Sequence, residues 1–207
     1  MNKLKVKDIA KAKQVVVIGA AKNMHRQYYD APFDGNNIKF PICFSSDSTK
    51  PDVKASVPQA KFCMTCTKNI KGSGEGNTKA CRIHQKIAIS EYDNLKGPVH
   101  QFVITSASLF SKSESYEGMG FLQYVKKLIY QGQSISSVVT KLTKTDEGIY
   151  SRVSFKPVAY LNRQELDYLR QRSNSEEVDD CLSFYKPLDL LEENHFFDVR
   201  KKMGIEV

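Results

Sequence analysis

The sequence contains no apolar run near the roughly 18 residues that a membrane-spanning helix needs. Its basic beginning, residues 1–13, is not followed by the apolar stretch of a secretion signal. Proline and glycine, at 7 and 11 of 207 residues, are too few for a fibrous or disordered chain. With 41% hydrophobic and 26% charged residues, the composition predicts a globular, cytoplasmic protein with one domain.

Acidic residues are scarce in the first half of the chain, where residues 1–100 hold 17 basic and 8 acidic side chains. The last 33 residues reverse this balance with 9 acidic and 4 basic side chains, and the whole chain carries a formal net charge of +8. A basic body favours a polyanionic partner, with nucleic acid ahead of an anionic membrane surface. The alternative is that the charge only aids solubility.

The five cysteines are odd in number, and without a secretion signal they argue against a disulfide framework. Four of them, Cys43, Cys63, Cys66 and Cys81, fall within 39 residues, whereas Cys181 stands apart and is assigned no role. A CxxC turn places two thiolates on one side of a metal ion, and a third ligand after a glycine-rich loop can close the other side. Zinc takes four such ligands in a tetrahedron, so the cluster predicts one Zn²⁺.

The fourth zinc ligand is either Cys43 or His84, and we favour Cys43 because thiolate-only sites suit structural zinc. Either choice leaves no open coordination position, which indicates a structural site. The competing interpretations are a redox CxxC or unrelated buried thiols. A redox CxxC usually begins a helix after a strand, and no such pattern precedes Cys63.

The loop between the cysteine pairs, residues 67–80, combines Gly72, Gly74 and Gly76 with lysines. Glycines allow the backbone to approach a ligand closely, so a loop of this kind can hold a phosphate backbone. The alternative interpretation is a flexible turn with solvated lysines and no binding role. The Walker A pattern of nucleotide-binding loops is absent.

Hydrophobic periodicity predicts strands at residues 14–18, 86–90, 101–105, 136–143 and 149–160, and helices at 117–130 and 163–171. Five strands with a helix between the third and fourth match a five-stranded barrel of the OB type. We therefore expect a mainly β (α+β) protein, an OB-type barrel with an inserted zinc-binding loop region at about 40–84 and one or two helices. Its parts are a basic N-terminal arm (1–13), the core (14–174) and an acidic C-terminal segment (175–207).

The sequence has no tryptophan, so base stacking must come from its 10 tyrosines and 11 phenylalanines. An OB-type barrel binds single strands with a basic groove for the backbone and aromatic faces for the bases. Several tyrosines stand beside positive charge, although half-buried surface tyrosines would look the same. The candidate nucleic-acid contacts are Lys22, Arg26, Tyr28, Tyr29, Lys68, Lys71, Lys79, Arg82, Tyr150, Arg152 and Lys156.

The cysteine motifs resemble those of a zinc-motif family of tailed-bacteriophage proteins, some of which are single-stranded DNA-binding replication proteins. The resemblance covers roughly residues 14–172 and is carried by Ile42-Cys-Phe-Ser-Ser-Asp47, Cys63-x-x-Cys66-x-x-Asn69, Gly72-Ser-Gly74 and Lys79-Ala-Cys81-Arg82. It implies an OB-type, zinc-structured protein that coats single strands in phage replication or recombination, in the host cytoplasm. In that family the upstream cysteine lies in the segment containing Ser-Ser-Asp, which favours Cys43 over His84.

We therefore expect a non-catalytic protein that binds single-stranded DNA. Its acidic C-terminal segment either recruits replication proteins, competes with DNA for the basic groove, or is only a solvated terminal segment. A nuclease would need clustered carboxylates, but Asp30, Asp34, Asp47 and Asp52 are scattered. The alternative is a zinc-containing interaction module, such as a transcription co-regulator or a host-takeover factor, that binds duplex DNA or a protein. A protein that recognises duplex DNA usually has a recognition helix rich in Arg, Asn and Gln, whereas the predicted helix 117–130 has a core-like apolar face.

Overall fold

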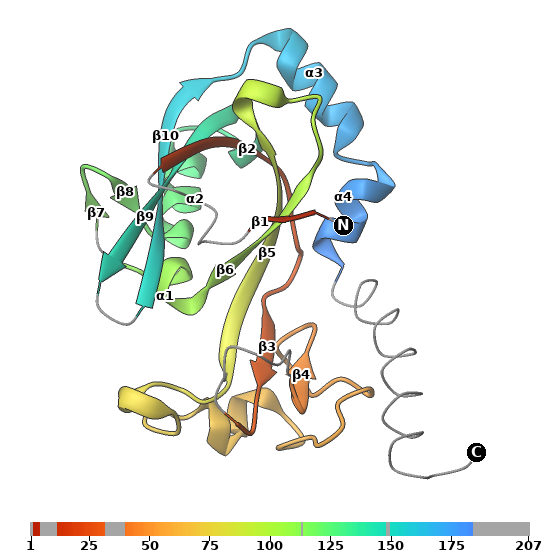
Figure 1. The fold of residues 1–207 in the computed structure, drawn as a ribbon, viewed down its shortest axis with the longest axis vertical. Coiled ribbons are helices and arrows are strands. Elements are labelled where there is room, and N and C mark those ends of the chain that lie inside the picture. Colours follow the sequence, from red (N-terminus) through yellow and green to blue (C-terminus); the bar gives the residue numbers. More distant parts are fainter. Residues whose placement is uncertain (1, 5–11, 32–39, 113, 148–149, 184–207) are drawn as a thin grey trace.

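The computed structural model describes residues 2–4, 12–31, 40–112, 114–147 and 150–183. Within them ten strands form one mixed sheet with the strand order β1-β6-β5-β2-β9-β10-β8-β7, and β3 joins it by pairing with β5 and β4 (Figure 1). The strands are β1 (Asn2–Leu4), β2 (Ala12–Ala20), β3 (His25–Tyr28), β4 (Cys43–Ser45), β5 (Arg82–Glu91), β6 (His100–Thr105), β7 (Glu114–Ser115), β8 (Gly118–Met119), β9 (Val138–Glu147) and β10 (Tyr150–Tyr160).

The central strand β2 is buried on both faces, which explains the unbroken apolar run in its sequence. Val15 and Val17 belong to one hydrophobic core, and Val16 and Ile18 belong to a second core on the opposite face. The first core lies under α1 (Ser106–Leu109) and α2 (Phe121–Tyr130). The second lies under α3 (Arg163–Arg172) and α4 (Glu176–Leu182), so helices cover both faces of the sheet.

The larger core packs α2 against β10 and the neighbouring strands. Phe121 and Phe155 meet edge to face with ring centroids 5.1 Å apart, and the Tyr124 hydroxyl lies 2.5 Å from the hydroxyl of Thr140. Gly118 in β8 approaches β10 so closely that a Cβ there would lie 2.7 Å from the carbonyl oxygen of Phe155. Only glycine therefore lets β8 pair with β10 at this point.

The second core is closed by α3 and α4, which follow one another in the sequence. Asn162 precedes α3 and forms a capping box with Glu165. The Glu165 amide donates to the Asn162 side chain, and the Asn162 amide donates to the Glu165 carboxylate. In α4, Val178 and Cys181 are buried against the sheet. The predicted acidic segment 175–207 thus begins as a packed helix, and residues 184–207 lie outside the described part of the chain.

A separate region, which we call the cysteine lobe, is formed by residues 25–31 and 40–83 and extends from one end of the sheet (Figure 1). It contains β3, β4 and the short turns η2 (Cys63–Thr65), η3 (Thr67–Asn69) and η4 (Glu75–Asn77). Strand β5 begins in the lobe and continues into the sheet, joining the two. Two further 3₁₀ turns, η5 (Tyr92–Asn94) and η6 (Ile135–Ser137), lie in the sheet region.

The expected mainly β, α+β class is confirmed, but the expected closed five-stranded barrel is not shown. The strand path starts at β1 and ends at β7, and these edges do not pair within the described residues, so the sheet is open. The expected basic arm is only partly described. Its residues 2–4 form β1 beside β6, residues 12 and 13 begin β2, and residues 5–11 lie outside the description. None of the described helices is both long and apolar enough to cross a bilayer.

Candidate metal centre and nucleic-acid interface

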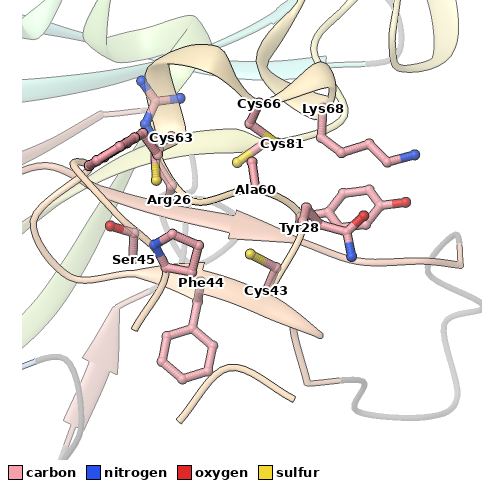
Figure 2. Close-up of a pocket in the computed structure, with 13 residues that line it drawn as sticks. Arg26, Tyr28, Cys43, Phe44, Ser45, Ala60, Cys63, Cys66, Lys68 and Cys81 are labelled. Atoms are coloured by element: carbon pink, nitrogen blue, oxygen red, sulfur yellow. The ribbon is translucent and has the colours of Figure 1, made fainter. Parts of the chain in front are cut away.

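Four cysteines from three segments of the lobe surround one small cavity (Figure 2). Cys43 comes from β4, Cys63 begins the turn η2, Cys66 directly follows this turn, and Cys81 directly precedes β5. Cys43, Cys63 and Cys66 are buried, and Cys81 is half-buried. The cavity has a volume of about 20 Å³, which is room for one small ion or water and far too little for an organic ligand.

Backbone hydrogen bonds hold the three segments together around the cavity. The Cys63 amide donates to the Thr49 carbonyl at 2.9 Å, and the Cys81 amide donates to the Lys68 carbonyl at 2.8 Å. Pairing of β4 with β3 sets Cys43 opposite Tyr28. The local backbone therefore brings together cysteines that are up to 38 positions apart in the sequence.

The glycine loop between Cys66 and Cys81 is a compact turn in the structure. The amides of Gly72 and Gly74 both donate to the Thr78 carbonyl, at 2.9 and 3.0 Å. Gly72 has a φ of 90°, in the left-handed region that favours glycine. A Cβ on Gly74 would lie 2.9 Å from the Ala80 amide nitrogen, so the close approach also needs glycine.

Burial dominates the electrostatics of the thiols. It raises the pKa of Cys43 and raises that of Cys81 to about 11, and negative charge on Cys63 and Cys66 raises both further. The guanidinium of Arg26 acts in the opposite direction on Cys81. Without a cation beside them Cys43 and Cys81 are therefore thiols, because each thiolate would be desolvated.

Arg26 is buried beneath the cavity, with only 7% of its surface exposed. Its Nη1 donates to Oδ1 of Asn69 at 2.8 Å, Lys79 Nζ donates to the same oxygen at 3.1 Å, and Nδ2 of Asn69 donates to the Cys63 carbonyl at 3.0 Å. No carboxylate within the described residues forms an ion pair with Arg26. The expected role of Arg26 as a nucleic-acid contact stays a prediction, and in the described structure its guanidinium donates to Asn69 within the lobe.

The two candidates for the fourth ligand of the predicted zinc site lie in different surroundings. Cys43 lines the cavity, whereas His84 lies in β5 opposite His25 and is not among the cavity residues. Both ring nitrogens of His84 are buried without a hydrogen-bond partner in the described chain, and burial lowers its pKa to about 4. As the side chains stand, no three His, Cys, Asp or Glu residues within the described ranges are arranged to hold a metal ion.

The outer surface of the lobe is rich in cations and exposed apolar side chains. Lys61, Lys71, Lys79 and Arg82 are exposed, Lys68 is half-buried, and no described carboxylate forms an ion pair with any of these five. The carboxylates of Asp47 and Asp52 instead accept hydrogen bonds from nearby backbone amides. Some cations elsewhere in the described chain are paired with carboxylates, as in Lys127 with Glu114 and Arg172 with Glu177.

Of the tyrosines expected to stack bases, Tyr28 and Tyr29 both lie on the lobe and are half-buried. Lys68 Nζ lies over the Tyr28 ring, 5.1 Å from its centroid (Figure 2). The Tyr29 hydroxyl donates to Oε1 of Gln27 at 3.4 Å, and burial raises its pKa. Lys22 is exposed in the short connection between β2 and β3.

The remaining predicted contacts lie on β10, away from the lobe. Arg152 and Lys156 are half-buried on the face opposite Val153 and Phe155, as the alternating sequence predicts. Tyr150 is part of β10, but its side chain lies outside the description. Because β2 and β9 separate β10 from β5 and the lobe, the structure does not bring the two predicted groups together.

Three exposed side chains in the structure were not among the candidate contacts. Phe62 and Met64 flank Cys63 on the lobe, and Tyr116 lies between β7 and β8 with Lys156 Nζ 4.1 Å from its ring centroid. The Lys61-Phe62 pair beside the CxxC turn is a signal that could have identified Phe62.

Comparison of this chain with models of protein families, with curated proteins and with solved structures finds no match.

Proposed function

We propose that this protein is a non-catalytic single-stranded DNA-binding protein whose cysteine lobe is stabilised by one structural Zn²⁺. The observation that carries the proposal is that Cys43, Cys63, Cys66 and Cys81 all line one small cavity in a lobe whose surface carries exposed cations. The resemblance of these motifs to phage replication proteins supports DNA as the polyanionic ligand. It also supports a role in phage replication or recombination. A closed OB-type barrel is not needed for this proposal.

The lobe is short of other means of stabilisation. Its separate hydrophobic cluster consists of Phe44 and Ala55 alone among the described residues. Segments with so little apolar burial usually need a disulfide or a metal ion to hold one conformation. A metal bound by the four cysteines would supply that free energy, because binding at a structural site is part of folding.

The charges around the cavity suit a zinc thiolate centre. Zn²⁺ favours deprotonated thiols strongly enough to overcome the raised pKa values of Cys43 and Cys81. A tetrathiolate centre has a net negative charge, and Arg26 and Lys79 meet at Asn69 beside it. The buried guanidinium of Arg26 would then have the anionic partner that the described carboxylates do not provide.

The surface of the lobe suits a single strand better than a folded substrate. Cations without carboxylate partners attract the phosphate backbone and release counterions on binding. Exposed rings beside them offer stacking faces for unpaired bases, at roughly 1–3 kcal/mol per base. This combination predicts binding that depends on salt and has little sequence preference.

Fluorescence anisotropy with a labelled 30-nucleotide poly-dT and a matched duplex, at two salt concentrations, tests the proposal. We expect tighter binding to poly-dT and weaker binding at the higher salt concentration. Lys71→Gln should reduce the slope of log affinity against log salt by about 0.7. Lys127→Gln is the matched control, because Lys127 is already paired with Glu114 and should leave the slope unchanged. Preference for the duplex, or no dependence on salt, would contradict the proposal.

The exposed apolar side chains of the lobe favour a second candidate, the zinc-containing interaction module. Val53, Met64 and Ile70 are well exposed near the cysteines, and apolar surface of this kind often marks a protein interface. A protein that keeps its zinc but binds poly-dT no better than duplex would support this candidate. Recruitment of replication proteins through the acidic C-terminal segment stays a prediction, with α4 as its described part.

A further inference from the structure

Two pairs of a lysine and an aromatic ring lie at the rim of the same cysteine cavity. Lys68 Nζ is 5.1 Å from the centroid of the Tyr28 ring, and Lys61 Nζ is 5.7 Å from that of Phe62. Tyr28, Phe62 and Lys68 all line the cavity, so the two rings are fixed to one structural unit. Phe62 is 47% exposed, which leaves much of its surface free for a ligand.

The backbone that bears the two rings is anchored by the cysteine region. Phe62 directly precedes Cys63, whose amide is bonded to Thr49, and Tyr28 pairs with Cys43 across β3 and β4. A ring held by its backbone loses little conformational entropy when a base stacks on it. Two such rings on one anchored frame are therefore suited to neighbouring bases of one strand.

The rest of the molecule offers less to a strand. Helices pack on parts of both faces of the sheet, with α1 and α2 on one side and α3 and α4 on the other. On β10, the Lys156 ammonium already donates to the Tyr116 carbonyl at 3.1 Å. The neighbouring Lys141 lies 3.6 Å from the carboxylate of Glu117. A phosphate on this surface would have to displace internal partners and approach Glu117.

Resting on the proposed function, we propose that single-stranded DNA binds on the cysteine lobe alone, with Phe62 and Tyr28 stacking bases and Lys61 and Lys68 contacting phosphates. The surface of β10 that carries Arg152 and Lys156 is then not part of the binding site. When a base occupies the ring face, the flexible lysine moves to the adjacent phosphate. At Phe62 the phosphate is bound by Lys61, the preceding residue in the sequence. At Tyr28 it is bound by Lys68, whose side chain lies over the ring.

The absence of tryptophan from the chain allows a local test of this site. Phe62→Trp and Tyr116→Trp each introduce a single indole, one on the lobe and one beside Lys156. Titration with poly-dT, followed by anisotropy of the labelled strand and by indole fluorescence, should quench the indole at position 62 and leave that at position 116 unchanged. Quenching at position 116 with no change at 62 would overturn the inference.

Phe62→Ala and Phe110→Ala measure the contribution of the ring with a matched control. Phe110 is 46% exposed, close to the 47% of Phe62, but it lies at the end of α1 in the sheet region. We expect Phe62→Ala to weaken poly-dT binding at least about fivefold, Phe62→Tyr to restore it, and Phe110→Ala to leave it unchanged. Bound zinc, measured in each variant, shows that the lobe is intact.

The outcomes separate this inference from the proposed function. If the unaltered protein does not bind poly-dT, the proposed function fails. If it binds, while Phe62→Ala binds as tightly as Phe110→Ala and no quenching occurs at position 62, the proposed function stands and the inference is wrong.

Discussion

The buried guanidinium of Arg26 donates a hydrogen bond to the side chain of Asn69 at 2.8 Å. The two residues are 43 positions apart in the sequence, and Asn69 in turn donates to the carbonyl of Cys63. This chain of hydrogen bonds links β3 to the turn that follows the CxxC motif. It positions a cation beside Cys81 without using any carboxylate in the described residues.

Asn69→Ala tests this link. Removing the amide leaves the buried Arg26 without its acceptor and the Cys63 carbonyl without its donor, and each loss has a desolvation cost. We expect the free energy of unfolding to fall by about 1–3 kcal/mol. Urea denaturation measures the change, and the exposed Thr67→Ala in the same turn is the control. Equal stability of the two variants would show that the link contributes nothing.

The cysteines give a sharper prediction, because the chain carries its own control. Cys43→Ala, Cys63→Ala, Cys66→Ala and Cys81→Ala should each lose the bound zinc and lower the melting temperature. Cys181→Ala should retain one zinc per chain, since Cys181 is buried in the second core. His84→Ala should also retain it. Elemental analysis of the purified variants decides, and loss of zinc in His84→Ala but not in Cys43→Ala would overturn the assignment.

The pH dependence of stability should carry a signature of His84. Burial first, and then the charges of Arg82 and Lys86, lower its pKa from 6.5 to about 4. In the unfolded chain His84 is therefore protonated below about pH 6.5, whereas in the folded chain it is protonated only below about pH 4. The contribution of the neutral imidazole is fully present above pH 6.5 and is lost as the pH falls from 6.5 to about 4.

His84→Leu removes this titration and keeps the site apolar. Urea midpoints measured at intervals from pH 7.5 to 4.5 should fall more steeply for the unaltered protein than for the variant. Both proteins lose zinc as thiolates protonate, so the difference between the two curves is the quantity of interest. Parallel curves would show that His84 is accessible to protons in the folded state.

The C-terminal boundary of the folded region gives a fourth prediction. Val178 and Cys181 are buried, Lys86 Nζ donates to the Ser183 carbonyl at 2.7 Å, and Gln101 donates to the Cys181 carbonyl at 2.8 Å. A chain that ends at residue 174 should therefore melt at a lower temperature than one that ends at residue 183. Calorimetry of the two truncated proteins measures this. Equal melting temperatures would mean that α4 adds no stability.

The strongly patterned elements could be predicted from the sequence, and the structure shows why. The apolar run Val15–Ile18 is a strand buried on both faces, and α3 begins at Arg163, where the periodicity predicted a helix. Helix α4 was missed because its acidic side chains dominate seven residues, of which only Val178 and Cys181 are fully buried. Local pattern could not reveal that the charged stretch covers the second core.

The sheet order and the site depend on contacts between distant residues. β2 pairs with β5 and β9, and no local signal specifies those partners or the short strands β1, β3 and β4. Spacing alone left Cys43 and His84 as alternatives for the cavity. The pairing of β4 with β3 places Cys43 there, and the pairing of β5 with β3 directs His84 elsewhere. The burial of Arg26 was not predicted, because charge alone does not report burial.

One measurement tests the link between the cysteine lobe and strand binding most directly. Anisotropy titrations of labelled poly-dT are compared for the zinc-loaded protein and for the same protein after chelation. We expect the zinc-loaded protein to bind tightly, with an affinity that falls as salt rises. Chelation should greatly reduce this affinity, and adding zinc back should restore it. Equal affinity of the loaded and chelated proteins would contradict this expectation, because the surface that binds DNA would then not depend on the metal.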